Sequence, residues 1–365
     1  MNGRDTAGAR DPILVVVALL VRWRTPRPPT EPEATLSDPT QYAPTPQEPL
    51  GSGFGARTTA LEAVDGIDLS GRHVIVTGGY SGLGIEVVRA LHHAGATITV
   101  PARRPDAARA ALDAEGLQDV LVDALDLADQ ESVAAFAERY ADSGRGLDLL
   151  INNAAVMAAP LSRVGPGWES QFATNHLGHY ALTNRLWPLL VASSGARVVE
   201  LSSSGHKLSP VRFDDLHFET GYDKWAAYGQ AKTANALFAV ELDARGSRDG
   251  VRAFAVHPGG IMTPLQRHLP REEMIAAGWI DADGNVDSRF KTPEQGAATT
   301  VWAATAPLLE GKGGVYLEDV DIASPTDPDA PTARVRGVDA HAVDRDAAAR
   351  LWQVSADLTG VDAFR

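Results

Sequence analysis

Residues 73–84 read HVIVTGGYSGLG, a short apolar run followed by four glycines. The apolar run has the length and β-branched content of a buried strand, and apolar residues at helical spacing follow over 82–93. Glycines between a strand and a helix permit a tight turn and let the backbone approach a diphosphate at the N-terminus of the helix. The stretch therefore predicts a strand–turn–helix unit that binds a dinucleotide.

Strands and helices alternate through the rest of the chain. We expect further strands at 96–100, 119–122, 147–151, 197–201, 252–256 and 314–317, and helices near 130–140, 169–190, 224–245 and 293–304. Regular alternation with short connections implies a parallel sheet covered by helices on both faces. The predicted fold is α/β, a Rossmann-type doubly wound parallel sheet of about seven strands, formed by a single domain over residues 56–365.

The first 55 residues differ in composition from this domain. An apolar run at 13–21 is shorter than the roughly 20 residues that span a bilayer, and residues 25–50 are dense in Pro, Thr and Glu. Such a segment buries too little apolar surface to offset the entropy lost on ordering. We expect residues 1–55 to be a disordered leader and linker, and whether they occur in the mature protein or touch a membrane stays open.

Composition excludes several classes of function. The formal net charge of −14 argues against a general nucleic-acid binder, which needs a surplus of Lys and Arg. The chain has no Cys, which excludes disulfides and thiolate–metal sites, and no ligand cluster at metal-binding spacing is visible. We expect no metal, no nucleic acid and a cytoplasmic location, and we do not expect the domain over 56–365 to contact a membrane.

Further motifs follow the glycine turn in a fixed order: Asp126-Leu127, Asn152-Asn153-Ala154, Asn175, Ser203, Tyr228-x-x-x-Lys232 and His257-Pro258-Gly259. Together with the T-G-x-x-x-G-x-G spacing, this set resembles the compact branch of the short-chain dehydrogenase/reductase family over about residues 56–365. Segments 291–305 and 313–323 look like the retinol dehydrogenase and WW-domain oxidoreductase subgroup. One departure is Ala155, where the family usually has Gly.

The resemblance assigns catalytic roles to four residues. Tyr228 is the expected general acid–base, and Lys232, four residues later on the same helical face, is expected to lower the pKa of the phenol from its usual value near 10. Ser203 would orient the substrate oxygen, with Ser202 as the alternative, and Asn175 would join a proton relay to the lysine. The nearby His176 and His179 are expected to be packing or surface residues.

The end of the second strand bears on the choice of cofactor. An NAD enzyme places a carboxylate there for the ribose 2′-hydroxyl, whereas this chain has Ala102 followed by Arg103 and Arg104. A guanidinium can bind a 2′-phosphate, so NADP(H) is the preferred cofactor and NAD(H) the alternative. By the resemblance, the cofactor is bound by Gly78, Tyr80, Ser81, Gly82, Leu83, Gly84, Arg103, Asp126, Leu127, Asn153, Ala154, Tyr228, Lys232, Pro258, Gly259, Ile261 and Thr263.

The sequence says less about the part of the site that binds the substrate. A lid is expected near residues 262–292, and an apolar pocket is expected to be lined by Leu208, Val211, Phe213, Trp225, Leu265 and Met274. The predicted function is an NADP(H)-dependent oxidoreductase that moves a hydride between the nicotinamide and a hydrophobic carbonyl or alcohol. The alternative is a catalytically silent NADP(H)-binding sensor. Helices near Asn175 and Tyr228 often build interfaces in the family, so a homodimer or homotetramer is the expected assembly.

Overall fold

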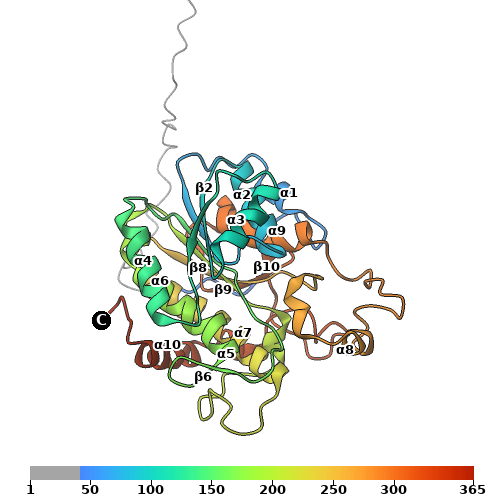
Figure 1. Ribbon diagram of the computed structural model, residues 1–365. Helices are drawn as coiled ribbons and strands as arrows, with labels where there is room; N and C mark the ends of the chain where they lie inside the picture. Colours follow the sequence, from blue (N-terminus) through green and yellow to red (C-terminus); the bar gives the residue numbers. More distant parts are fainter. Residues whose placement is uncertain (1–41) are drawn as a thin grey trace, which may run out of the picture. The chain divides into compact units, whose positions relative to one another are not determined.

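The computed structural model describes residues 42–365, and these form one compact unit. Its strands are β1 (His73–Val76), β2 (Thr97–Ala102), β3 (Leu121–Ala124), β4 (Leu149–Asn152), β7 (Arg197–Leu201), β8 (Arg252–His257), β9 (Val315–Glu318) and β10 (Asp321–Ile322). They build one sheet in the order β10-β9-β8-β7-β4-β1-β2-β3 (Figure 1). Every neighbouring pair is parallel except β9 and β10. Two short strands, β5 (Arg163–Val164) and β6 (Trp168–Glu169), pair separately.

Helices cover both faces of this sheet, as its strands require. On β1, Val74 and Val76 belong to one buried cluster while Ile75 belongs to the other, so both faces of the strand lie in a hydrophobic core. The first cluster packs the sheet against α1 (Ala60–Val64), α2 (Leu83–His93), α3 (Pro105–Ala114) and α9 (Pro293–Thr305). The second packs it against α4 (Gln130–Asp142), α6 (Gly178–Ala192), α7 (Lys224–Gly246) and α10 (Arg345–Thr359).

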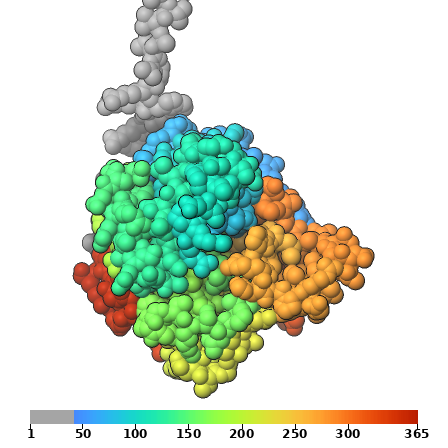
Figure 2. Space-filling view, in the orientation of Figure 1, coloured from blue at the N-terminus to red at the C-terminus, as the bar shows by residue number. Residues whose placement is uncertain are grey.

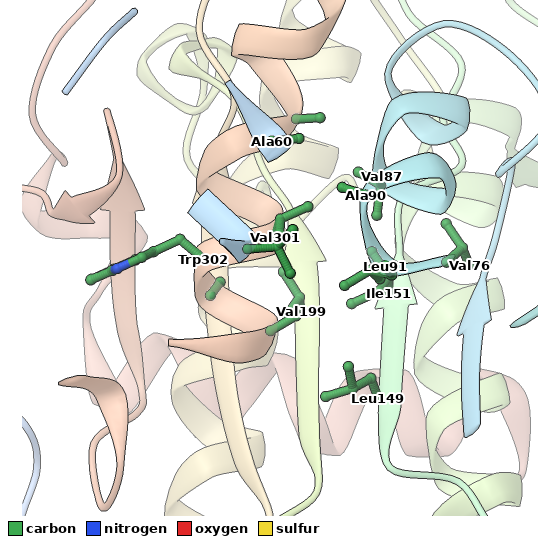
Figure 3. Close-up of a cluster of buried hydrophobic side chains, with 14 of the residues drawn as sticks. Ala60, Val76, Val87, Ala90, Leu91, Leu149, Ile151, Val199, Val301 and Trp302 are labelled. Atoms are coloured by element: carbon green, nitrogen blue, oxygen red, sulfur yellow. The ribbon is translucent and has the colours of Figure 1, made fainter. Parts of the chain in front are cut away.

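Figure 3 shows how the first cluster fills the space between the strands and their helices. Strand side chains approach α2 and α9 from the sheet, and the labelled residues include Val76, Leu149, Ile151, Val199, Leu91, Val301 and Trp302. The close packing of α2 against β1 in this cluster fixes where α2 begins. That placement brings the glycine turn to the carboxyl end of the sheet.

The predicted Rossmann-type fold is confirmed, with differences in detail. The sheet has eight strands rather than about seven, because the chain turns back after β9 to add the antiparallel β10. The single helix expected over 169–190 begins as α5 (Ser170–Phe172), continues as a π-helical turn over Ala173–Leu177 and only then becomes α6. At the start of α6, a Cβ on Gly178 would lie 2.2 Å from the Leu127 carbonyl oxygen, so this close approach to the loop after β3 needs glycine.

The predicted boundary at residue 55 is wrong, because residues 42–55 are part of the compact unit. The Tyr42 hydroxyl donates to Asp243 (2.9 Å). The Gln47 amide bonds the backbone N–H of Tyr316 (2.9 Å) and the carbonyls of Tyr316 and Ala323 (both 2.7 Å). A segment poor in apolar residues is thus fixed by polar side chains that pair with the backbone of β9 and the end of β10. Residues 1–41, with the apolar run at 13–21, lie outside the described residues.

The expected lid region, residues 262–292, carries the short helix α8 (Arg271–Ala276) and protrudes from the sheet and its helices (Figures 1 and 2). The two ends of this region are joined by an isolated parallel bridge between Ile261 and Lys291, outside the named strands. Among the helices of residues 42–365, none combines the length and apolar content needed to cross a bilayer.

Candidate active site

A cavity of about 1120 Å³ opens at the carboxyl ends of the parallel strands. Its walls are the segments that follow β1, β2, β3, β4, β7, β8 and β9, together with the lid. Strand order reverses between β1 and β4, which is where ligands bind in doubly wound sheets. Every residue predicted to bind the cofactor lines this cavity, as do Ser203, Tyr228 and Lys232, whereas Asn175 does not.

The glycine turn forms a cradle that larger side chains would fill. Gly78 and Gly82 have φ values of 66° and 54°, in the left-handed region that favours glycine. A Cβ on Gly84 would lie 2.3 Å from the Gly78 carbonyl oxygen, and a Cβ on Gly79 would lie 2.8 Å from Val88 and Val100. The turn leads directly into α2, whose first backbone N–H groups lack partners within the helix. This geometry fits a diphosphate group.

Thr77, which directly follows β1, links the end of that strand to the end of β4. Its hydroxyl oxygen accepts from the backbone N–H of Asn153 (2.9 Å) and Ala154 (3.0 Å). Because both lone pairs of the Thr77 hydroxyl oxygen are engaged, the hydroxyl group donates its own proton to another acceptor. That acceptor is His179 Nε2, which lies 2.9 Å from the hydroxyl oxygen, rather than the Ile151 carbonyl at 3.4 Å. His179 therefore carries its own proton on Nδ1 and donates to the Asn175 carbonyl (2.9 Å).

His179 and His176 are both buried, which agrees with the expected packing role. Burial lowers the pKa of His179 to about 4, so its ring is neutral near pH 7. His176 bonds Ser355 of α10 (2.8 Å), and burial lowers its pKa to about 3. The polar link from Thr77 to Asn175 was not foreseen, because it joins residues whose proximity only the fold creates.

The oxygen and the nitrogen of the Asn175 side chain each bond the loop after β4. Its Oδ1 accepts from the N–H of Val156 (2.8 Å), and its Nδ2 donates to the carbonyl of the same residue (2.9 Å). The residue lies in the π-helical turn before α6, behind the cavity wall. Its expected relay role stays a prediction.

Tyr228 and Ser203 meet in the cavity. The phenol hydrogen-bonds with the Ser203 side chain, and a Cβ on Gly205 would lie only 2.6 Å from Tyr228 Cε1. One turn further along α7, Lys232 Nζ lies 5.7 Å from the centre of the Tyr228 ring and donates to the Leu201 carbonyl (2.7 Å). Ser202 Oγ donates to the backbone carbonyl of Lys232 (2.7 Å), so Ser203 is the serine that faces the phenol.

Burial dominates the electrostatics of this pair. It raises the pKa of Tyr228 to about 12, against the opposing hydrogen bond with Ser203. It lowers the pKa of Lys232 to about 8, against the opposing charge of Glu200. In this arrangement burial outweighs the other influences on the phenol, and Lys232 Nζ donates to a backbone carbonyl. The expectation that Lys232, together with a bound oxidised nicotinamide, lowers the phenol pKa stays a prediction.

The other end of the cavity carries exposed positive charge. Arg103 and Arg104 follow β2 on its rim, and neither forms a salt bridge with any other residue of the 42–365 unit. Asp126, after β3, accepts from the backbone N–H of Ala128 (3.0 Å). The described residues contain no group of three or more His, Asp or Glu side chains placed to bind a metal ion.

The apolar pocket was predicted in part. Leu208, Trp225 and Leu265 line the cavity. Val211 and Phe213 do not, because they pack with Trp168 and Phe172 in a separate cluster, and Met274 packs against the cavity wall without lining it. The apolar lining residues that escaped prediction include Met157, Trp279 and Phe290. The last two lie in the expected lid, but nothing in the sequence shows which lid side chains face inward.

The sheet order and the glycine cradle place the chain among the Rossmann-type nucleotide-binding proteins. The family model described as short chain dehydrogenase matches residues 72–274. A Streptomyces lividans protein named "Probable oxidoreductase" is 46% identical over 80% of this chain and 98% of its own length. Mouse Retinol dehydrogenase 12 is 36% identical over 81% of this chain and 88% of its own length.

A solved structure has a similar fold. The crystal structure of an uncharacterised protein from Mycobacterium paratuberculosis is 33% identical, with a TM-score of 0.64 over 85% of this chain and 99% of that chain. The chain belongs to the short-chain dehydrogenase/reductase family of oxidoreductases and resembles its retinol dehydrogenases, as the motifs predicted.

Proposed function

We propose that this protein is an NADP(H)-dependent oxidoreductase that acts on a hydrophobic carbonyl or alcohol, with Tyr228 as general acid–base. The observation that carries the proposal is the convergence of Tyr228, Ser203 and Lys232 on the cavity that also contains the glycine cradle. A binding module would need the cradle alone.

The proposed chemistry divides the work between the cofactor and the chain. A bound reduced nicotinamide supplies a hydride to the carbonyl carbon. Ser203 orients the carbonyl oxygen, and Tyr228 donates a proton to it. Since burial raises the pKa of Tyr228 to about 12, the phenol is protonated near pH 7 and suits a proton donor better than a base.

The lining of the cavity supports an apolar substrate. Met157, Leu265, Trp279 and Phe290 surround the space next to Tyr228 and Ser203, and such side chains bind apolar surface. Relatives named retinol dehydrogenases point to the same class. The protein's own substrate is best sought among hydrophobic aldehydes and ketones.

The test is NADPH oxidation with a panel of such carbonyls. Tyr228→Phe should lower kcat by roughly 10²- to 10⁴-fold, the usual contribution of a general acid, while the Kd for NADPH stays unchanged. Tyr222→Phe is the matched control, because the Tyr222 hydroxyl bonds Ala159 and Gln171 outside the cavity. Wild-type NADPH binding without turnover would favour the sensor function, and retained turnover in Tyr228→Phe would overturn the role of the phenol.

We propose NADP(H) over NAD(H) because Ala102 replaces a carboxylate and Arg103 is exposed beside it. A charge-assisted bond to the 2′-phosphate is worth roughly 1.5–3 kcal/mol, so Arg103→Ala should lower kcat/KM for NADPH by roughly 10- to 150-fold and leave NADH unaffected. Arg185→Ala, an exposed position on α6 away from the cavity, is the control. Equal kcat/KM for both cofactors, insensitive to Arg103→Ala, would reject the preference.

We also propose a cytoplasmic location and a homodimer or homotetramer. A cysteine-free chain of 365 residues suits a reducing compartment. Light scattering coupled to size exclusion measures the assembly directly, and a monomer at micromolar concentration would contradict it.

A further inference from the structure

One peptide group beside the active site is bonded by two histidines. This group, the serine peptide, joins Ser203 to Ser204 shortly after β7. Its carbonyl accepts from His206 Nδ1 (2.7 Å), and its N–H donates to His257 Nδ1 (3.2 Å). Both histidines are buried, and neither has a role in the proposed chemistry. The two rings thus bond both ends of the peptide group that follows the serine of the site.

The partners of His206 determine which of its nitrogens carries the proton. The backbone N–H of Asp339 donates to Nε2 (3.1 Å), and a main-chain N–H can only donate, so Nε2 has no proton. The neutral ring therefore carries its proton on Nδ1 and donates it to the Ser203 carbonyl. The Tyr316 hydroxyl oxygen lies 3.2 Å from the same Nδ1 as a second acceptor. Burial lowers the pKa of His206 to about 4, so this ring is neutral near pH 7.

His257 has its proton on the other ring nitrogen. Its Nδ1 accepts from the backbone N–H groups of Ser204 (3.2 Å) and Gly259 (3.3 Å). Because both partners are donors, Nδ1 has no proton, and the neutral ring carries it on Nε2. Burial lowers the pKa of His257 to about 3, and the charge of Lys291 acts in the same direction. The same nitrogen therefore links the serine peptide to a glycine that is expected to bind the cofactor.

The orientation of the serine peptide determines where the serine hydroxyl lies. The next N–H along the chain, that of Gly205, donates to Ser203 Oγ (3.0 Å). A Cβ on Gly229 of α7 would lie 2.9 Å from the Gly205 carbonyl oxygen, so this turn packs directly on the helix that carries Tyr228. Rotation of the serine peptide would move the Gly205 N–H, and with it the hydroxyl that hydrogen-bonds with the Tyr228 phenol.

The main chain fixes only one end of this peptide group. The backbone N–H of His206 donates to the Ser203 carbonyl (3.0 Å), which closes the turn. A bond at the carbonyl alone would let the peptide plane tilt about that point. The bond from the Ser204 N–H to His257 removes this freedom, because it holds the opposite end of the same plane.

We propose that His206 and His257 together hold the serine peptide in one orientation and thereby keep the Ser203 hydroxyl against the catalytic phenol. The inference rests on the proposed function. Both histidines are positioning residues that act through the serine. Neither ring transfers a proton in this role, since each keeps a single tautomer throughout the reaction.

Asparagine and glutamine variants separate this role from general packing. The amide of asparagine lies where histidine has Nδ1, whereas the amide of glutamine lies near Nε2, so His206→Asn keeps a donor for the serine peptide and His206→Gln removes it. We expect His206→Gln to lower kcat by about 10-fold with KM for NADPH and for the carbonyl unchanged, and His206→Asn to recover most of this loss. His176→Gln is the matched control, because His176 is an equally buried histidine that bonds Ser355 outside the cavity. Equal kcat values in the two His206 variants would overturn the inference.

A double-mutant cycle tests whether the two histidines act through one peptide group. His257→Gln should also lower kcat by about 10-fold and, because the bond to Gly259 is lost, raise the Kd for NADPH. When both side chains hold the same group, the double variant loses much less than the roughly 100-fold that independent effects would give. A full product of the two single losses, or an unchanged kcat in His257→Gln, would contradict the joint action.

Nitrogen NMR of the wild-type chain provides a readout that needs neither turnover nor a stable variant. At pH 7 both rings should be neutral, with the proton on Nδ1 in His206 and on Nε2 in His257. The same tautomer in both rings, or a charged ring in either, would overturn the inference alone. Absence of wild-type turnover with any carbonyl would instead sink the proposed function.

Discussion

Replacing Gly84 by alanine tests the cradle on which cofactor binding depends. The added Cβ would lie 2.3 Å from the Gly78 carbonyl oxygen and 2.7 Å from Asn153 Nδ2. Ordinary contact begins near 3.4 Å, so the methyl group overlaps a backbone oxygen by about 1.1 Å (3.4 − 2.3). Neither the backbone of the turn nor the amide can rotate away, because Asn153 Nδ2 donates to the Thr77 carbonyl at 2.8 Å.

The expected cost follows from this overlap. Overpacking in a closely packed site costs roughly 1–3 kcal/mol, and loss of the Asn153–Thr77 bond adds about 1 kcal/mol. The free variant relaxes by displacing the turn, and NADPH binding must then restore it. Together these costs come to roughly 2–4 kcal/mol, so we expect the Kd for NADPH to rise by about 30- to 900-fold.

Titration calorimetry with NADPH measures this effect, and urea unfolding measures how much of the cost falls on the free protein. Gly146→Ala is the control, because a Cβ there would meet nothing closer than 4.0 Å, at His73. An unchanged Kd and an unchanged free energy of unfolding in Gly84→Ala would refute the described turn. A loss of stability with an unchanged Kd would show that the turn lies outside the cofactor site.

Two further predictions concern stability. Gln47→Ala should lower the free energy of unfolding by roughly 1–3 kcal/mol in urea titrations, because three backbone groups of Tyr316 and Ala323 lose their partner. Gln118→Ala, at an exposed position, is its control, and equal losses would contradict the docking of this segment. Burial lowers the pKa of His176 to about 3, whereas in the unfolded chain it is near 6.5, so this histidine costs the fold nothing above pH 6.5 and progressively more below it. His176→Gln should therefore be less stable than wild type at pH 7.5, with the gap closing by about 1 kcal/mol at pH 5.5; a gap that does not change with pH would contradict the buried neutral ring.

Local patterns predicted most of the fold. Alternating apolar strands and helical stretches gave β1, α4, β7, α7 and α9 within a few residues of their observed bounds. The helix α10 was missed, because it packs at the edge of the second core and no motif marks it. The π-helical turn at Ala173–Leu177 was missed because no local pattern distinguishes it from the single helix expected over 169–190.

Sequence motifs also predicted many of the residues that line the site. The positions after each strand were recognised by motif, and they line one cavity because parallel strands end at the same edge of a sheet. The apolar pocket was predicted only in part, since Val211 and Phe213 face a neighbouring cluster while Trp279 and Phe290 line the cavity. An apolar side chain gains from burial in either place, so hydrophobicity by itself does not distinguish a core from a pocket.

The sequence alone determined the strand–turn–helix at 73–84, the doubly wound sheet and the tyrosine–lysine pair, because each depends on steric and helical rules that act within a few residues. Tertiary structure alone decided that Tyr42–Gly55 docks on the sheet, that Ser203 rather than Ser202 faces Tyr228, and that the buried Glu200 bonds Asn152. These contacts join residues tens to hundreds of positions apart. Strand order and register bring them together, and no local pattern encodes which distant partner a side chain will meet.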